Sequence, residues 1–127
     1  MKELFTAMAS AQAEMEAATK DSANPFFKSK YADLNSVMGA VKPAFAKHGL
    51  AFIQICHDAE HAAKVETVII HTSGQQFSCG SVSVPVSKID AQGYGSALTY
   101  ARRYSLAAAA GVGAASAEAA ASRPVWR

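Results

Sequence analysis

Hydrophobic residues in the first part of the chain recur at the spacing of α-helices. The first such stripe runs through residues 2–19 and consists of Leu4, Met8, Ala11, Met15 and Ala18. A break follows at Asn24-Pro25, because the residue before a proline is disfavoured in the helical region. A second stripe predicts a helix that ends at His48, with Asp33 or Asn35 as its N-cap. This part of the chain is therefore expected to form two helices joined by a loop.

After Leu50 the pattern changes to short runs rich in Val, Ile, Phe, Ser and Thr, which predict strands. The runs cover residues 51–57, 64–72 and 76–86. Valine and serine alternate in the third run, which is typical of an antiparallel sheet with one covered and one open face. Residues 90–110 return to helical spacing. The predicted fold is therefore α+β, with two N-terminal helices, a three-stranded antiparallel β-meander and a C-terminal helix packed on the sheet.

Length and composition favour a single folded domain. The chain has 127 residues, of which 50% are hydrophobic and 17% are charged, enough for one buried core. We expect this domain over residues 1–110 and a mobile tail over residues 111–127, which are rich in Ala, Gly and Ser. The apolar runs are too short to cross a bilayer, and the first residues do not form an export signal. The two cysteines lack disulfide-scaffold spacing, so we expect a protein of a reducing cytoplasm.

The last predicted helix has a polar face. At about 100° per residue, roughly one third of its circumference holds Gln92, Ser96, Thr99, Tyr100 and Arg103. Arg102 falls at the boundary of this stripe, and the opposite side, expected to pack on the sheet, holds Ala97, Leu98, Ala101, Tyr104, Ser105 and Ala108. Arginine binds phosphate through two N–H groups and tyrosine stacks on unpaired bases, so the combination suits single-stranded nucleic acid. The alternative is that these are ordinary solvated charges and core rings.

Positive charge also gathers after the first helix. The net charge is only +2, but residues 20–47 carry five lysines against two aspartates. Within this segment, Phe26-Phe-Lys-Ser-Lys-Tyr31 again interleaves aromatic and basic side chains. It therefore repeats the combination found on the last helix.

Signatures of catalysis are weak. His57-Asp-Ala-Glu-His61 matches the H-x-x-E-H pattern of zinc proteases, which requires both histidines on one helix. Here the segment joins two predicted strands, so we expect a solvated turn and no metal site. There is no phosphate-binding loop of the G-x-x-x-x-G-K-[ST] type and no evident acid/base pair, so we expect neither ATP use nor enzymatic activity.

Three longer stretches resemble the ERF superfamily, whose members are phage and prophage single-strand annealing proteins named for essential recombination function. The stretches are Asn24-Pro-Phe-Phe-Lys-Ser-Lys-Tyr-Ala-Asp-Leu34, Val41-Lys-Pro-Ala-Phe-Ala-Lys-His-Gly-Leu50 and Gly95-Ser-Ala-Leu-Thr-Tyr-Ala-Arg-Arg-Tyr104. They occur in this order, and the resemblance covers about residues 5–113.

The resemblance implies ATP-independent binding of single-stranded DNA and annealing of complementary strands in phage-type homologous recombination, without catalysis or cofactor. It also implies a homo-oligomeric ring or filament in the cytoplasm of a bacterial host, with the fold of the strand-annealing ring-protein core. Residues 1–110 would form this annealing core. Beyond single-stranded DNA, the expected partners are a phage exonuclease or a host single-strand-binding protein, and no membrane is expected.

The residues expected to bind DNA belong to the first and last stretches: Lys28, Lys30, Tyr31, Ser96, Thr99, Tyr100, Arg102 and Arg103. The lysines and arginines are expected to pair with phosphates, the tyrosines to stack or to position the strand, and the hydroxyls to donate hydrogen bonds. Other functions stay open at this point. They are a passive coat that does not anneal, a structural oligomer with no DNA role and, less favoured, a metal-dependent nuclease or protease that uses His57 and His61.

Overall fold

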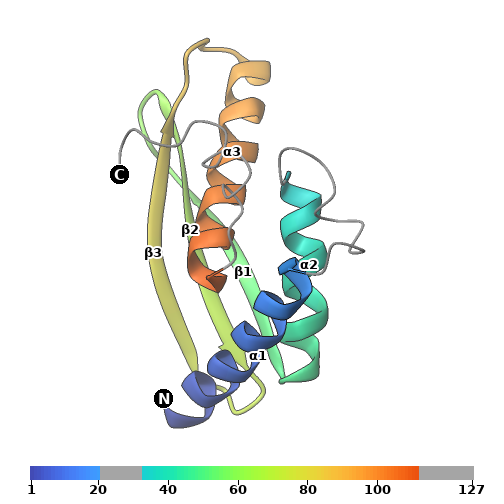
Figure 1. Ribbon diagram of the computed structural model, residues 1–127. Coiled ribbons are helices and arrows are strands. Elements are labelled where there is room, and N and C mark those ends of the chain that lie inside the picture. Colours follow the sequence, from blue (N-terminus) through green and yellow to red (C-terminus); the bar gives the residue numbers. More distant parts are fainter. Residues whose placement is uncertain (21–32, 112–127) are drawn as a thin grey trace, which may run out of the picture.

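The computed structural model describes residues 1–20 and 33–111 (Figure 1). Its elements, in chain order, are α1 (Lys2–Lys20), α2 (Leu34–Lys47), β1 (Leu50–His57), β2 (Ala62–His71), β3 (Gln76–Pro85) and α3 (Ala91–Ala110). The predicted α+β class and the order of elements are confirmed, and each boundary agrees with its prediction to within two residues. The predicted tail lies outside the described residues except for Gly111.

The three strands form one antiparallel sheet in the order β1-β2-β3, the predicted meander. Along β2 and β3 the register shifts between Glu66 and Val68, where β3 has one extra residue. Gly80 lies at this bulge with φ 85°, a conformation that glycine adopts without steric cost. Because of this extra residue, the side chains of β3 alternate between the two faces of the sheet both before and after the bulge.

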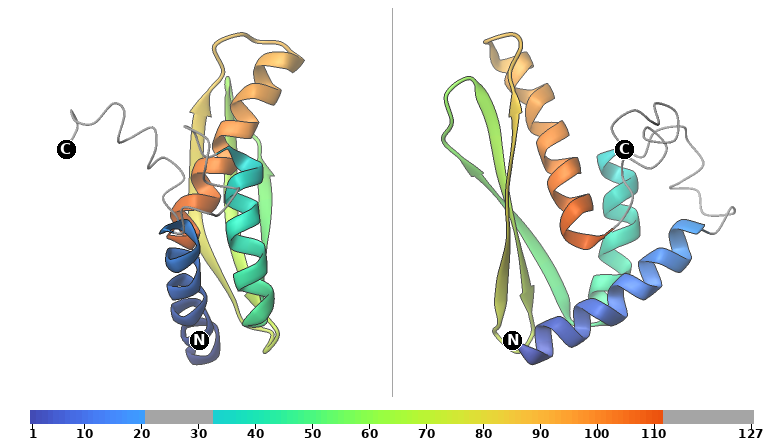
Figure 2. Two further views of the ribbon diagram at one scale, coloured as in Figure 1. Left: turned by 45° about the vertical axis from the view of Figure 1, so that its right-hand side comes forward. Right: turned by 60° about the vertical axis from the view of Figure 1, so that its left-hand side comes forward.

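The helices cover one face of the sheet (Figure 2). α3 packs on β2 and β3, and α2 packs against β1 and α3. α1 crosses one end of the sheet and packs on α2. Among the described residues, no element covers the opposite face, where Ile53 and Ile55 are exposed.

The covered face contains two apolar clusters separated by a polar layer. The larger cluster includes Leu4, Phe45, Leu50, Ile69 and Leu106. The smaller one consists of Ala63, Val65, Val86, Ala97 and Ala101, whose small side chains bring the first half of α3 close to the sheet. Between them along both elements, the buried hydroxyls of Thr67 on β2 and Ser105 on α3 are hydrogen-bonded at 2.5 Å. This layer fixes where α3 lies along β2.

Aspartates cap the two helices that surround the candidate site. Asp33 accepts a hydrogen bond from the backbone N–H of Ser36 at 2.8 Å, so Asp33 and not Asn35 is the N-cap of α2. Asp90 accepts from the N–H of Gly93 at 2.7 Å at the start of α3. Gly93 has no room for a side chain, because an added Cβ would lie 1.8 Å from the carbonyl oxygen of Lys88. None of the described helices is long and apolar enough to span a membrane.

Candidate nucleic-acid interface

Most of α3 presents the faces that the sequence predicts. Gln92, Ser96, Thr99 and Tyr100 are exposed, whereas Ala97, Ala101 and Ser105 are buried against the sheet. The hydroxyl of Thr99 donates to the carbonyl oxygen of Gly95 at 3.0 Å, so its oxygen can serve an incoming group as an acceptor.

Three positions on α3 differ from the prediction. Tyr104 was expected to pack on the sheet, but its ring stacks against that of Tyr100 beside Arg103. Arg103 was expected on the exposed stripe, but it is only 8% exposed. Ala108 was expected against the sheet and is exposed. The guanidinium of Arg103 is covered in part by the rings of Tyr100 and Tyr104, and the start of α2, at Asp33 and Leu34, lines a cavity beside it. A projection of one helix carries no information about that neighbour.

Arg103 lies against two tyrosine rings. Its Cζ atom is 5.0 Å from the ring centroid of Tyr100 and 4.7 Å from that of Tyr104. Its Nη2 donates to the Tyr104 hydroxyl at 2.9 Å. The two rings are nearly parallel, with an interplanar angle of 16° and centroids 6.1 Å apart. Tyr100 remains 47% exposed, so this cluster presents one aromatic ring to solvent above a largely covered guanidinium.

A cavity of about 330 Å³ lies where α2 begins beside α3. Its lining residues are Asp33, Leu34, Ser96, Thr99, Tyr100 and Arg103. Hydrogen bonds from Ser36 lower the pKa of the Asp33 carboxyl, and the positive charge of Arg103 contributes in the same direction. A second cavity of about 400 Å³ shares Ser96 and Tyr100 and continues to Lys88 before α3. Together they form a polar surface along one flank of α3.

The basic and aromatic residues predicted before α2, namely Lys28, Lys30 and Tyr31, lie outside the described residues. Tyr31 precedes Asp33 by two positions in the chain, and Asp33 lines the cavity beside α3. This segment therefore ends close in sequence to a residue that lines the cavity beside α3.

Arg102 lies on the other flank of α3. Its Nε donates to Oε1 of Gln54 at 3.3 Å, and Nε2 of Gln54 donates to the Arg102 carbonyl oxygen at 2.9 Å. Gln54 Nε2 also donates to Thr67 at 3.2 Å, which connects Arg102 to the polar layer beneath. The structure thus places Arg102 on a different flank of α3 from Ser96, Thr99 and Tyr100, although the sequence predicts all four as DNA contacts.

A groove follows β1 on this flank. One cavity, of about 360 Å³, is lined by the polar residues Lys42, Gln54 and Arg102 and by the apolar residues Met38, Phe52 and Leu98. A neighbouring cavity of about 280 Å³ shares Cys56 and Leu98 and adds His57, Lys64 and Tyr94. At roughly 3.3 Å per residue, the stretch of β1 from Phe52 to His57 makes this groove about 17 Å long.

Lys42 was not among the predicted site residues. It is exposed on α2, and in the sequence it is one of the five lysines that give residues 20–47 their positive excess. That excess was the one available signal, because only the packing of α2 beside β1 brings Lys42 to the same cavity as Arg102. The groove therefore offers two cations together with the apolar side chains of Met38, Phe52 and Leu98 and the amide of Gln54.

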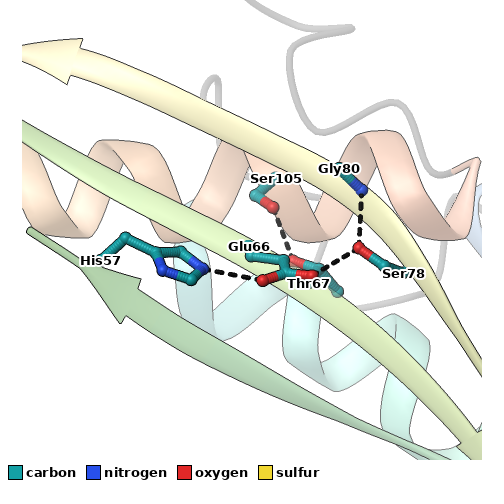
Figure 3. A network of polar contacts seen from close by, with 6 residues as sticks. All are labelled: His57, Glu66, Thr67, Ser78, Gly80 and Ser105. Carbon is teal, nitrogen blue, oxygen red and sulfur yellow. Dashed lines mark hydrogen bonds and ion pairs between the residues drawn. The ribbon is translucent and has the colours of Figure 1, made fainter.

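A separate polar network lies on the open face of the sheet (Figure 3). Glu66 on β2 accepts from Ser78 on β3 at 2.5 Å and pairs with Nε2 of His57 on β1 at 2.7 Å. These contacts, the one from Ser78 first, lower the pKa of the Glu66 carboxyl. Thr67, the next residue, points to the covered face and contacts Ser105. The network therefore connects all three strands from the side away from α3.

The H-x-x-E-H segment forms the connection between β1 and β2, as predicted, and is not helical. His57 ends β1 and pairs with Glu66, while His61 lies in the turn with φ 56°. The helical arrangement on which zinc-protease chemistry depends is therefore not formed here.

A family model of the ERF superfamily matches residues 4–119, nearly the whole chain. No curated protein and no solved structure matches the chain.

Proposed function

This chain belongs to the ERF superfamily, and from that membership we propose that it binds single-stranded DNA and anneals complementary strands without ATP. Membership supports a role in phage recombination through single-strand annealing, a family activity that is generally not catalytic. We propose residues 1–110 as the annealing core and the bacterial cytoplasm as its place of action. The proposed assembly is a homo-oligomeric ring or filament that receives its strands from a phage exonuclease or a host single-strand-binding protein.

The observation that carries the proposal is the meeting of α2 and α3 at one polar surface. Asp33, at the end of the first ERF-like stretch, shares a cavity with Ser96, Thr99 and Tyr100 of the last stretch. Ser96, Thr99 and Tyr100 supply this surface with hydroxyl oxygens and an exposed aromatic ring, and Asp33 brings the end of a segment some 60 positions earlier in the chain beside them. Such groups suit a strand whose bases are unpaired.

Cations flank this surface. In the groove along β1, Arg102 and Lys42 share a cavity with the apolar residues Phe52 and Leu98, which suits phosphates on the cations and base faces on the apolar side chains. The hydrogen bond from its Nε to Gln54 holds the Arg102 guanidinium at the groove. We propose Lys28 and Lys30 as further phosphate contacts and Tyr31 as a further aromatic contact, because their segment leads directly into Asp33.

Annealing by this surface needs no chemical step. Pairing of complementary strands is already favourable, since stacking contributes about 1.4 kcal/mol per base-pair step. The obstacle is repulsion between two phosphate chains, together with the disorder of each free strand. A protein that neutralises phosphates and holds a strand extended lowers both barriers and leaves the base edges accessible to the complement.

The salt dependence of binding tests the proposed phosphate contacts. We would measure the affinity for a dye-labelled single-stranded oligonucleotide by fluorescence anisotropy over a range of salt concentrations. Arg102→Gln and Lys42→Gln should each lower the slope of log K against log [salt] by about 0.7, the value for one phosphate contact on a single strand. The matched control is Lys2→Gln, which removes the same charge at the exposed start of α1 and should leave the slope unchanged. Absence of binding, or binding independent of salt, would refute the proposed function.

A further inference from the structure

We propose that Tyr100, Arg103 and Tyr104 form a preassembled stacking site for one unpaired nucleobase, in which Arg103 positions the rings and does not contact phosphate. This inference rests on the proposed single-strand binding and assigns a different role to Arg103 from the one that the sequence indicates.

The burial of Arg103 argues against a phosphate contact. The residue is only 8% exposed, and its guanidinium lies within 5.0 Å of both ring centroids. To reach a phosphate in solution, the guanidinium would have to leave both rings and break the 2.9 Å hydrogen bond to the Tyr104 hydroxyl. Arg102, its neighbour in the chain, lines an open groove, and its hydrogen bond to Gln54 uses Nε and not the terminal nitrogens. The two adjacent arginines therefore have different roles.

The same contacts hold the tyrosine rings in place. A guanidinium over an aromatic face is attracted by the negative charge of the ring face, and this attraction strengthens where water is excluded. Arg103 makes this contact with both rings, which lie 16° from parallel. Tyr104 is half-buried and Tyr100 is 47% exposed, so the inner ring and the guanidinium support the outer ring. A ring held in this way loses little further freedom when it binds a base.

The position of Tyr100 suits a nucleobase. Its ring lines both cavities on this flank of α3, and Ser96 and Thr99 lie beside it. Every base has an aromatic face, so stacking on Tyr100 would be tolerant of sequence, as a protein that anneals any complementary pair requires. Hydroxyl oxygens next to the ring would meet polar groups of the base or sugar.

The test compares two oligonucleotides of equal length, one with normal bases and one made of abasic residues. Wild-type protein should bind the normal strand more tightly, and Tyr100→Leu should remove about 5- to 150-fold of that preference, the range for one stacked base. Arg103→Met should remove part of the same preference and leave the salt slope unchanged. The matched comparison is Arg102→Gln, which should weaken both strands equally and lower the slope by about 0.7.

Two further measurements keep the test decisive. In the double variant Tyr100→Leu/Arg103→Met, the loss should not exceed that of Tyr100→Leu alone, because both changes remove the same stacked ring. If Arg103→Met does not fold by circular dichroism, Tyr104→Phe replaces it, since this variant removes only the hydroxyl that accepts from Arg103. Tyr104→Phe should also reduce the preference for the normal strand at an unchanged salt slope.

The outcomes separate this inference from the proposed function. A wild-type protein that binds neither strand refutes the proposed function, and the stacking site with it. If the wild type binds but Arg103→Met behaves like Arg102→Gln, only the positioning role of Arg103 is overturned. A preference for normal bases that Tyr100→Leu leaves intact overturns the stacking site and leaves single-strand binding in place.

Discussion

Replacing Thr67 with valine tests whether the polar layer between β2 and α3 holds the helix that carries the candidate site. Thr67 is 0% exposed and Ser105 is 4% exposed, and their hydroxyls are 2.5 Å apart. Thr67 also accepts from Nε2 of Gln54 at 3.2 Å. Valine has nearly the shape of threonine but cannot form either bond, so the substitution isolates the hydroxyl from the volume of the side chain.

The expected loss of stability depends on which hydroxyl group each substitution leaves without a hydrogen-bond partner. Thr67→Val deprives the buried Ser105 hydroxyl of this partner, and leaving such a group unsatisfied costs about 1–3 kcal/mol. Ser105→Ala should cost about 1 kcal/mol, because the Thr67 hydroxyl keeps its bond from Gln54. In the double variant no unmatched hydroxyl remains on Ser105, so the cost should fall below the sum of the single costs by about 1 kcal/mol.

The assay is urea unfolding at 25 °C followed by circular dichroism, with the slope of free energy against urea checked for constancy across the variants. Thermal unfolding should agree, with a fall in Tm of about 4 °C for each kcal/mol lost. Single costs below about 0.5 kcal/mol, or costs that simply add, would refute the reasoning that this buried pair couples α3 to β2.

Three other predictions concern the helix ends and the open face of the sheet. Gly93→Ala should destabilise the protein in urea, because a Cβ there would lie 1.8 Å from a backbone carbonyl oxygen. Gly95 has open space around it, so Gly95→Ala should be neutral or should stabilise the protein by up to about 1 kcal/mol. Gln75→Ala should cost about 0.5–2 kcal/mol in the same assay, because its side-chain oxygen accepts from the first turn of α1 at 2.9 Å. Since Ser78 and the neighbouring imidazole lower the pKa of Glu66 below 4.5, their contribution is present above pH 4.5 and lost as the pH falls through the lowered pKa. Glu66→Gln should therefore flatten the acid side of the curve of stability against pH, and an unchanged curve would contradict the role of this network.

The spacing of hydrophobic residues predicts which face of a single helix or strand is covered. The alternation of valine and serine in β3 identified its covered face, and helical spacing placed Ser96, Thr99 and Tyr100 on the exposed side of α3. The sequence pattern gave no indication that Arg103 is buried, because helical spacing does not show that its guanidinium folds back onto the rings of Tyr100 and Tyr104.

The same limit applies to the groove along β1. The hydrogen bonds between Gln54 and Arg102 join residues 48 positions apart, and Lys42 reaches this groove only through the packing of α2. Local spacing identifies candidate side chains, but tertiary contacts decide which of them share a cavity and which become supports for others.

The most direct test of the central claim follows two complementary oligonucleotides, one with a donor dye and one with an acceptor dye. Pairing is recorded with and without protein, in the absence of nucleotide and with a chelator present. A protein that anneals strands by neutralising and extending them should make pairing faster than it is without protein. Pairing that is slowed would instead indicate a protective coat, and pairing that is unchanged at every protein concentration would contradict strand annealing by this chain.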